Sequence, residues 1–289
     1  MNPPLIYLIV FLASFVFCVL LTPLIRRAAL KGNLVARPRD DRWHKRPTAL
    51  LGGVSLFVVL MAIWQLSFLQ LGLYSATKPL VPLALGCLAI FLLGLADDLF
   101  DINPQHKLVG QIIIASLLVI FGFQVQWFTS RTANLVISIF WLVAITNAFN
   151  LLDNMDGLSA GVAFIAGLFL FLSRAFSGLE SVVPALLVLA VFLGSLLGFL
   201  IYNFHPASIF MGDSGSLLVG FLIAGLTTEA SGLMAGRQSG HLVFVLAIPI
   251  LILFIPILDT AFVSLMLSLI HISEPTRPLY ISYAVFCLK

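Results

Sequence analysis

Long apolar segments separated by short polar loops dominate this chain of 289 residues. A transmembrane helix requires about 20 predominantly apolar residues, and nine segments of the sequence have that character. The predicted spans are Leu5–Ile25, Leu50–Leu71, Leu80–Ala96, Leu108–Val125, Leu135–Leu152, Leu158–Phe176, Val182–Tyr202, Ser216–Thr228 and Leu242–Met266. Because no internal repeat and no low-complexity linker is visible, the sequence predicts one all-α, polytopic transmembrane helix bundle.

Composition excludes the soluble alternatives. Hydrophobic residues make up 61% of the chain and charged residues only 9%, whereas a soluble globule carries about 25% charged residues. Such a chain cannot cover a water-facing surface, and it is too apolar for a disordered protein. Its 3 cysteines do not predict a disulfide scaffold. The first apolar run lacks a preceding basic segment and is long enough to span, so we expect no cleavable signal peptide.

The basic residues are concentrated between Arg26 and Arg46, directly after the first span. A basic loop beside a membrane span favours the cytoplasmic side, which places the N-terminus outside. Alternation of the nine spans then puts most of the acidic residues at the inner face. These are Asp40, Asp41, Asp97, Asp98, Asp101, Asp153, Asp156 and Asp213. Carboxylates gathered beside basic residues on one side of a membrane indicate a functional site.

Three carboxylates lie at the end of the third predicted span. On a helix, Asp97, Asp98 and Asp101 would lie at roughly 0°, 100° and 40° and share one face. Neighbouring like charges raise one another's pKa unless a cation joins them, and oxygen-only ligands suit Mg²⁺ or Mn²⁺. The alternative is a solvated helix end, although acidic side chains there oppose the helix dipole.

A second polar series closes the fifth predicted span. Asn147, Asn150 and Asp153 recur every three residues and so stay near one helix face. Gly157 permits a turn that would return Asp156 to the same face. Polar residues are costly in an apolar segment unless they face protein or water. The alternative is polar contact between helices, which leaves the two aspartates unexplained.

A segment of small residues precedes the eighth predicted span, from Phe210 to Ser216. Gly212 and Gly215 would let backbone amides approach an anion at the start of the following helix. Asp213 is placed to hold a metal ion beside that anion. Taken alone, the segment could equally be a turn with a helix cap.

The first loop adds basic residues and a glycine pair, Gly52-Gly53. Most of its charges are explained by contact with anionic lipid. Lys45 and Thr48 lie closest to the glycines and are better placed to bind phosphate. We assign no catalytic role to His44, His106 or His205.

Metal-binding carboxylates, backbone amides and basic residues are the groups that phosphoryl transfer needs, because that chemistry consists mainly of positioning and charge neutralisation. A site embedded in the membrane suggests a lipid substrate. An ion-coupled transporter is the alternative from another class, since intramembrane acids often mark ion paths. Its sites would lie near the bilayer midplane, usually with inverted repeats, and neither feature is predicted here.

From about Thr22 to Met266, the chain resembles the polyprenyl-phosphate N-acetylhexosamine-1-phosphate transferases, the MraY/WecA/TagO-like members of glycosyltransferase family 4. Within the family the sequence leans toward the WecA/TagO side, and we see no strong sign of the branch that acts on a muramyl-pentapeptide nucleotide. The motifs that carry the resemblance are Arg42–Thr48 with Gly52-Gly53, Asp97-Asp98-x-x-Asp101, Asn147-x-x-Asn150-x-x-Asp153-x-x-Asp156-Gly157, Phe210-x-Gly212-Asp213-x-Gly215-Ser216 and Leu258-Asp259-Thr260.

The resemblance implies transfer of a sugar 1-phosphate from a cytoplasmic UDP-N-acetylhexosamine to a polyprenyl phosphate such as undecaprenyl phosphate, with release of UMP. Such an enzyme would begin cell-envelope glycan synthesis at the inner face of a bacterial plasma membrane. The implied cofactor is Mg²⁺, with Mn²⁺ as a substitute. The expected partners are the nucleotide sugar, the lipid and the membrane, not nucleic acid, and a homodimer is left open.

The resemblance also implies roles for individual residues. Asp213 would be the metal ligand. Asp97 and Asp98 would lie at the reacting phosphates, where they activate the lipid phosphate or support the metal. The residues expected to bind the nucleotide sugar are Asn150, Asp153 and Asp156, with Phe210 stacked on uracil, and Lys45 and Thr48 are expected at phosphate.

The C-terminal segment departs from the family pattern. After Met266 the family continues into a cytoplasmic loop with a histidine cluster, which is not seen here. Leu267–Arg277 and Ile281–Leu288 resemble the translated halves of a sequencing adapter, with a divergent natural tail as the alternative. We therefore expect a transferase domain over residues 1–266, an unrelated tail over 267–289, histidine-rich sequence after Met266 in the parent gene, and low activity of the chain as it stands.

Overall fold

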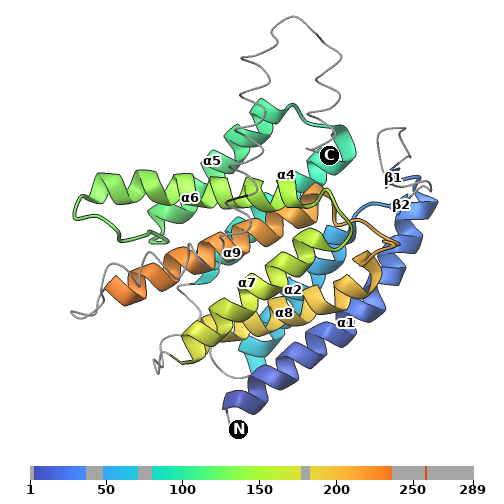
Figure 1. The fold of residues 1–289 in the computed structure, drawn as a ribbon, viewed down its shortest axis with the longest axis horizontal. Coiled ribbons are helices and arrows are strands. Elements are labelled where there is room, and N and C mark those ends of the chain that lie inside the picture. Colours follow the sequence, from blue (N-terminus) through green and yellow to red (C-terminus); the bar gives the residue numbers. More distant parts are fainter. Residues whose placement is uncertain (1–2, 37–47, 71–79, 177–182, 236–257, 259–289) are drawn as a thin grey trace, which may run out of the picture.

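The computed structural model describes residues 3–36, 48–70, 80–176 and 183–235, together with Leu258. These residues include eight long helices and two very short strands. The helices are α1 (Pro3–Lys31), α2 (Gly52–Gln70), α4 (Val81–Phe100), α5 (Pro104–Ile120), α6 (Arg131–Leu152), α7 (Leu158–Ala175), α8 (Val183–Asn203) and α9 (Gly212–Ala235), and the strands are β1 (Val35–Ala36) and β2 (Thr48–Ala49). The predicted all-α bundle is confirmed (Figure 1).

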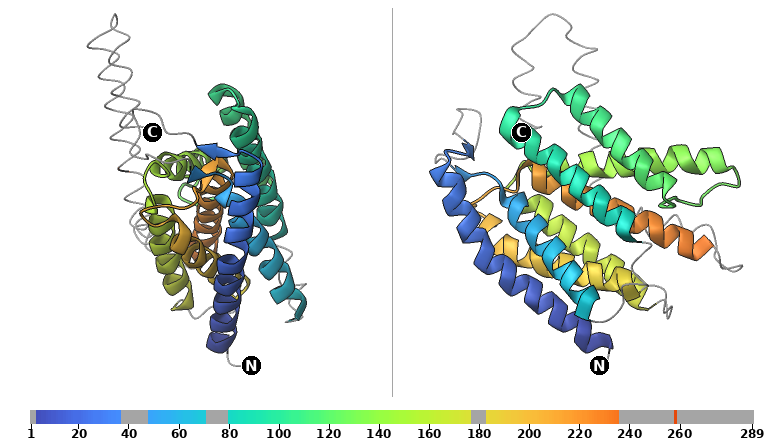
Figure 2. Two further views of the ribbon diagram at one scale, coloured as in Figure 1. Left: turned by 90° about the vertical axis from the view of Figure 1, so that its right-hand side faces the viewer. Right: turned by 180° about the vertical axis from the view of Figure 1, so that it is seen from behind.

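Two helices form the centre of the bundle. α8 packs against α1, α2 and α7, while α9 packs against α4, α6, α2 and α7. α5 lies against α4 and α6 (Figure 2). α8 is apolar on all sides and buried along almost its whole length, as expected for a helix surrounded by others.

The outer helices expose apolar side chains. On α1, Leu8, Leu12, Val16 and Leu20 are all exposed, and a surface of this kind suits lipid rather than water. By length and composition, 6 of the described helices could cross a membrane, namely α1, α2, α4, α6, α7 and α8. The prediction of nine spans is not confirmed: α5 is a shorter apolar helix, α9 is not among the six, and Leu242–Met266 lies outside the described residues apart from Leu258.

Glycines allow the closest helix contacts. A Cβ atom on Gly94 of α4 would lie 2.5 Å from the carbonyl oxygen of Asp213 on α9. On α8, Gly194 and Gly198 face the backbone carbonyls of Phe11 and Phe15 on α1. The two α8 glycines are four residues apart, the small-residue spacing that brings membrane helices together.

A network of backbone hydrogen bonds fixes the segment before α9. β1 and β2 pair antiparallel, and the amide of Phe210 donates to the carbonyl of Ala49 at 2.8 Å. At the start of α2, Gly52 and Gly53 donate to the carbonyls of Phe210 and Met211 at 2.9 and 2.8 Å. The glycine pair of the first loop therefore anchors the start of α9.

Among the helix boundaries that differ from those predicted, two matter for the site. α9 begins at Gly212 rather than Ser216 and ends at Ala235, because Gly212–Gly215 forms its first turn instead of a loop. α5 begins at Pro104 rather than Leu108, where the Asn103 side chain accepts a hydrogen bond from the amide of Gln105 and caps the helix. Small, polar and proline residues at helix starts do not register in an apolar pattern, although they are good helix-starting residues.

Candidate active site

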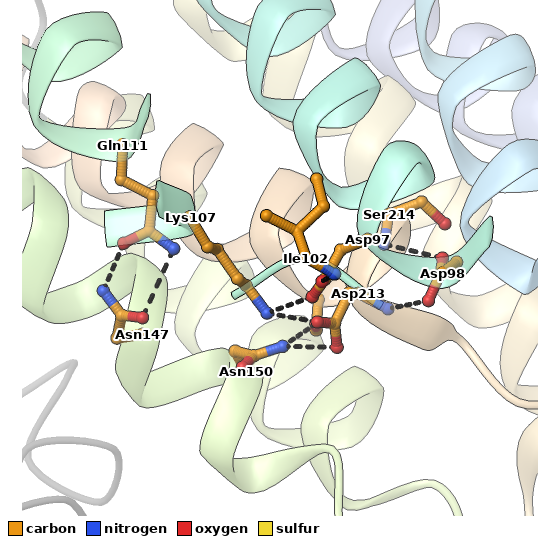
Figure 3. Close-up of polar contacts among 10 residues, drawn as sticks. Asp97, Asp98, Ile102, Lys107, Gln111, Asn147, Asn150, Asp213 and Ser214 are labelled. Carbon is orange, nitrogen blue, oxygen red and sulfur yellow. Dashed lines mark hydrogen bonds and ion pairs between the residues drawn. The ribbon is translucent and has the colours of Figure 1, made fainter. Parts of the chain in front are cut away.

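Four helix ends meet at one end of the bundle, and each contributes a polar side chain. Asp97 comes from the end of α4, Lys107 from the start of α5, Asn150 from the end of α6 and Asp213 from the start of α9 (Figure 3). The basic end of α1 lies at this same end, since Arg26 donates from Nε to the carbonyl of Ser208 at 3.0 Å. The predicted meeting of distant acidic motifs at one face is therefore present in the fold.

Lys107 bridges two of the carboxylates. Its Nζ donates to Oδ2 of Asp97 at 2.8 Å and also contacts Oδ2 of Asp213. The other oxygen of Asp97 accepts the backbone amide of Ile102 at 2.8 Å. Asn150 donates from Nδ2 to Oδ1 of Asp213 and to Oγ of Ser216, both at 2.9 Å. Asp213 is thus held from two sides by donors from α5 and α6.

Asp98 caps the α9 helix from a neighbouring helix. Its two carboxylate oxygens accept the backbone amides of Asp213 at 2.8 Å and Ser214 at 3.0 Å. Gly212 has a φ of +71°, and a Cβ there would lie 2.8 Å from an Asp98 oxygen. The sequence predicted that the amides at the start of α9 would bind an anion. In the structure, that anion is the Asp98 carboxylate of the protein itself. Its negative charge is favourable at the positive end of the helix dipole.

Asp101 does not join the other two acids of its motif. It follows the end of α4 with a φ of 52° in the left-handed region, and its side chain is exposed. The prediction that Asp97, Asp98 and Asp101 share one helix face is therefore wrong, because the helix ends before Asp101.

Asp153 lies directly after α6 and faces the same cluster. Burial raises its pKa well above the ordinary value, and the negative charges of Asp213 and Asp98 raise it further. A backbone hydrogen bond from Gly212 opposes this rise. A divalent cation would relieve the same repulsion.

The site fits Mg²⁺ in the way this ion usually binds. Within the described ranges, no group of three or more His, Cys, Asp and Glu side chains is arranged as a complete metal cage. Mg²⁺, however, is commonly held by one or two carboxylates together with substrate phosphates and water. Asp213 and Asp97 supply two carboxylates that already share one cationic partner, so the donor set suits the ion.

Asp156 occupies a second polar position nearby, against the segment between α8 and α9. Its Oδ2 accepts the amide of Ala207 at 3.0 Å and lies 2.9 Å from Nδ1 of His205, whose side chain is exposed. Its Oδ1 is buried without a hydrogen bond in the part of the chain that the structure describes. Asp156 therefore orients His205, a residue to which the sequence assigned no role.

Of the remaining predicted residues, Thr48 and Phe210 lie on the α2 side of the site. Thr48 is buried in β2, and Phe210 is half-buried between the β2 strand and the start of α2. Lys45 and the neighbouring loop lie outside the described residues. Asn147 exchanges amide hydrogen bonds with Gln111 of α5, at 2.5 and 3.3 Å.

Sequence reasoning missed Lys107 and Gln111. They are four residues apart and so lie on one face of α5, which faces Asp213 and Asn147 (Figure 3). A lysine followed four residues later by glutamine in an apolar helix was the available signal. The predicted span begins at Leu108 and so separates Lys107 from Gln111, whereas α5 begins at Pro104 and contains both.

Comparison with known proteins adds independent information. A model of the glycosyl transferase family 4 matches residues 80–231. The chain is 34% identical over 263 residues to a probable undecaprenyl-phosphate N-acetylglucosaminyl 1-phosphate transferase of Bacillus subtilis (strain 168), covering 88% of this chain and 70% of that protein.

Two further relatives extend the comparison. A decaprenyl-phosphate N-acetylglucosaminephosphotransferase of Mycolicibacterium smegmatis is 34% identical over 265 residues, covering 82% of this chain and 64% of the relative. A phospho-N-acetylmuramoyl-pentapeptide-transferase of Shouchella clausii is 31% identical over 251 residues, covering 76% of this chain and 73% of the relative. The chain thus spans between 64% and 73% of the length of these relatives.

Proposed function

Because the chain belongs to glycosyl transferase family 4, we propose that it transfers an N-acetylhexosamine 1-phosphate from a UDP-sugar to a polyprenyl phosphate. In this reaction, an oxygen of the lipid phosphate forms a new bond to the sugar-bearing phosphorus of the donor. The bond between that phosphorus and the oxygen of UMP breaks, and UMP leaves. The observation that carries the proposal is the meeting of Asp97, Asp213 and Lys107 from three helices at one end of the bundle.

Transfer between two phosphates requires that negative charge be neutralised while the reacting groups are aligned. Asp213 would hold Mg²⁺, with Asp97 as the second carboxylate beside it. The ion would supply charge neutralisation on the diphosphate of the donor. Asn150 supports this assignment because it holds the remaining oxygen of Asp213 at 2.9 Å.

Asp98 would not contact the reacting phosphates directly. Both its oxygens are engaged by the first amides of α9, so the geometry favours a role in holding Asp213 in place. Activation of the lipid phosphate would then fall to Asp97, the acid of the pair whose Oδ2 is bound by the Lys107 ammonium group rather than by a backbone amide.

The nucleotide would bind on the side of the site formed by the α6–α7 turn and the segment before α9. Asp153, Asp156 and Phe210 lie along this path, Thr48 begins the β2 strand, and Lys45 precedes it in the sequence. We propose that Phe210 stacks on the uracil and that Lys45 and Thr48 contact phosphate. The fixed backbone around Phe210 supports this placement, since a stacking residue needs a rigid base.

The site would face the cytoplasm of a bacterial cell, with the N-terminus outside. This orientation is supported by the basic residues Arg26, Arg27 and Lys31, which end α1 on the side of the bundle that carries the site. Basic residues flanking a membrane span favour the cytoplasmic side.

The ion-coupled transporter is not supported. None of the relatives described above is a transporter. Asp97 and Asp213 also lie in the last and first turns of their helices, whereas transporter sites lie near the bilayer midplane.

The proposal is tested by UMP release from UDP-N-acetylglucosamine, with added undecaprenyl phosphate and Mg²⁺. Because the chain spans 70% of its Bacillus subtilis relative, the assay uses the chain itself and a chimera that continues after Met266 with that relative's C-terminal residues. In whichever protein is active, Asp213→Asn and Asp97→Asn should each lower the rate by about 100-fold or more, as expected for loss of charged groups at the reacting atoms.

Asp101→Asn is the matched control, because Asp101 is exposed beside the same helix. It should retain nearly full activity. Near-normal UMP release by both the Asp97 and the Asp213 variants would refute the site assignment.

A further inference from the structure

The ammonium group of Lys107 lies between two carboxylates, where a positive charge is needed to offset their repulsion. Its Nζ lies between Oδ2 of Asp97 and Oδ2 of Asp213 (Figure 3). Only 13% of its side chain is exposed, so the ammonium group sits within the cluster rather than in solvent. It is positioned to neutralise two carboxylates from different helices that would otherwise repel each other.

A metal ion and this ammonium group compete for the same oxygen atoms. Mg²⁺ binds its ligands at about 2.0–2.1 Å in a strict octahedral arrangement. An ion bound to Oδ2 of both Asp97 and Asp213 would have to take the place of Nζ of Lys107, which contacts both atoms. Two cations on one carboxylate oxygen would also repel each other.

The structure allows the lysine side chain to leave while its helix stays. The ammonium is a point charge on a flexible four-carbon stem. One turn further along α5, Gln111 and Asn147 exchange two amide hydrogen bonds, and these hold the α5 backbone against α6. Asp213 likewise stays in place, because Asp98 binds its backbone amide and Asn150 binds its side chain.

We infer that Lys107 is an internal substitute for the metal ion: it fills the gap between Asp97 and Asp213 in the free protein, leaves when the divalent cation enters, and then pairs with the diphosphate of the donor. This inference rests on the proposed function. It makes the lysine both a competitor of the metal and a ligand of the substrate, so its removal should have opposite effects on metal binding and on turnover.

The test is a titration of the detergent-solubilised chain with Mn²⁺ alone, followed by electron paramagnetic resonance of the free ion. Lys107→Met keeps the length of the side chain and removes its charge. We expect this variant to bind Mn²⁺ about tenfold more tightly or better, because a competing like charge is lost. In an active protein, the same substitution should lower the rate of UMP release, because the charge that pairs with the diphosphate is gone.

Two comparison variants make the result specific. Lys31→Met removes a charge at the exposed end of α1 and should leave Mn²⁺ affinity unchanged. Lys107→Arg keeps the charge and can bridge both carboxylates through its planar group, so it should bind Mn²⁺ no more tightly than the parent chain. Misfolding does not produce a gain in affinity, so tighter binding by Lys107→Met alone supports the inference.

A second measurement uses the unaltered chain. Lys107 is partly shielded, and its reaction with an amine-modifying reagent, followed by mass spectrometry, should become faster when Mn²⁺ is added. Equal or weaker Mn²⁺ binding by Lys107→Met, or an unchanged labelling rate at saturating Mn²⁺, would overturn the inference while leaving the proposed function intact. Absence of Mn²⁺ binding in both proteins would refute the metal site and the inference with it.

Discussion

Two adjacent carboxylates at the end of α4 contact different partners. Successive residues on a helix point about 100° apart, so Asp97 faces Lys107 of α5 while Asp98 faces the start of α9. The two neighbouring acids therefore have different roles. One shares a cation with Asp213, and the other holds the helix that carries Asp213.

Asp98→Asn tests the helix-holding role at the scale of a single residue. Asparagine keeps one acceptor oxygen but turns an NH₂ group towards an amide that was bound at 2.8 or 3.0 Å. We expect a loss of about 1–3 kcal/mol in the free energy of unfolding, because a buried donor is left without an acceptor. The measurement is chemical unfolding in detergent, with Asp101→Asn as the control at an exposed position. Equal stability of the two variants would contradict the role assigned to Asp98.

At the scale of helices, small residues decide how closely the elements approach. The α4–α9 contact that brings Asp97 and Asp98 beside Asp213 depends on Gly94, which faces the backbone of Asp213 and Ser214. Side chains at this point would separate the two helices and move the acids apart. The geometry of the site is thus set by a residue that takes no part in the chemistry.

Gly94→Ala should therefore disturb both stability and the site. The added Cβ would lie 2.5 Å from a backbone oxygen and 2.7 Å from a backbone carbon of Asp213, and overpacking of this kind costs about 1–3 kcal/mol. We expect a lower melting temperature in detergent and weaker Mn²⁺ binding. Gly161→Ala on α7 is the matched control, since nothing lies within 4 Å of the added atom. A melting temperature for Gly94→Ala equal to that of Gly161→Ala would show that the contact is not tight.

At the scale of the whole molecule, the two ends of the helix bundle carry different residues. One end carries the clustered acids, Lys107 and the basic terminus of α1. The other end carries the loop between α5 and α6, where Ser130 caps the start of α6. A membrane protein with this asymmetry is inserted in one orientation, and the basic residues favour the site on the cytoplasmic side.

Cysteine labelling tests this orientation. In a chain whose native cysteines are replaced by alanine, Gln105→Cys places a single thiol at the start of α5, and Thr129→Cys places one in the loop between α5 and α6. Both positions are exposed. A membrane-impermeant maleimide added to intact cells should label only Thr129→Cys, and both variants should react once the cells are permeabilised. The reverse pattern would place the site outside and contradict the proposed use of a cytoplasmic nucleotide sugar.

Several details of the bundle could be predicted from the sequence only in part. Hydropathy located most helices but not the first turn of α9, where Gly212–Gly215 are too small and polar to register. The pair Gly194 and Gly198 on α8 has a recognisable spacing, yet nothing in the sequence specifies that its partner is α1. Lys107 directly precedes a predicted span, and the sequence predicts no role for it, although it contacts two of the predicted site residues.

Hydropathy and charge are properties of local segments, so the amino-acid sequence was enough to predict an apolar helical bundle with its acidic motifs at one end. It also carried the family motifs that indicate the chemistry. The individual contacts became visible only in the folded molecule: Asp98 binds the α9 amides, Asp156 contacts His205, and Lys107 lies between Asp97 and Asp213. These pairings depend on the rotation and approach of helices far apart in the chain, which are set by the packing of all their neighbours.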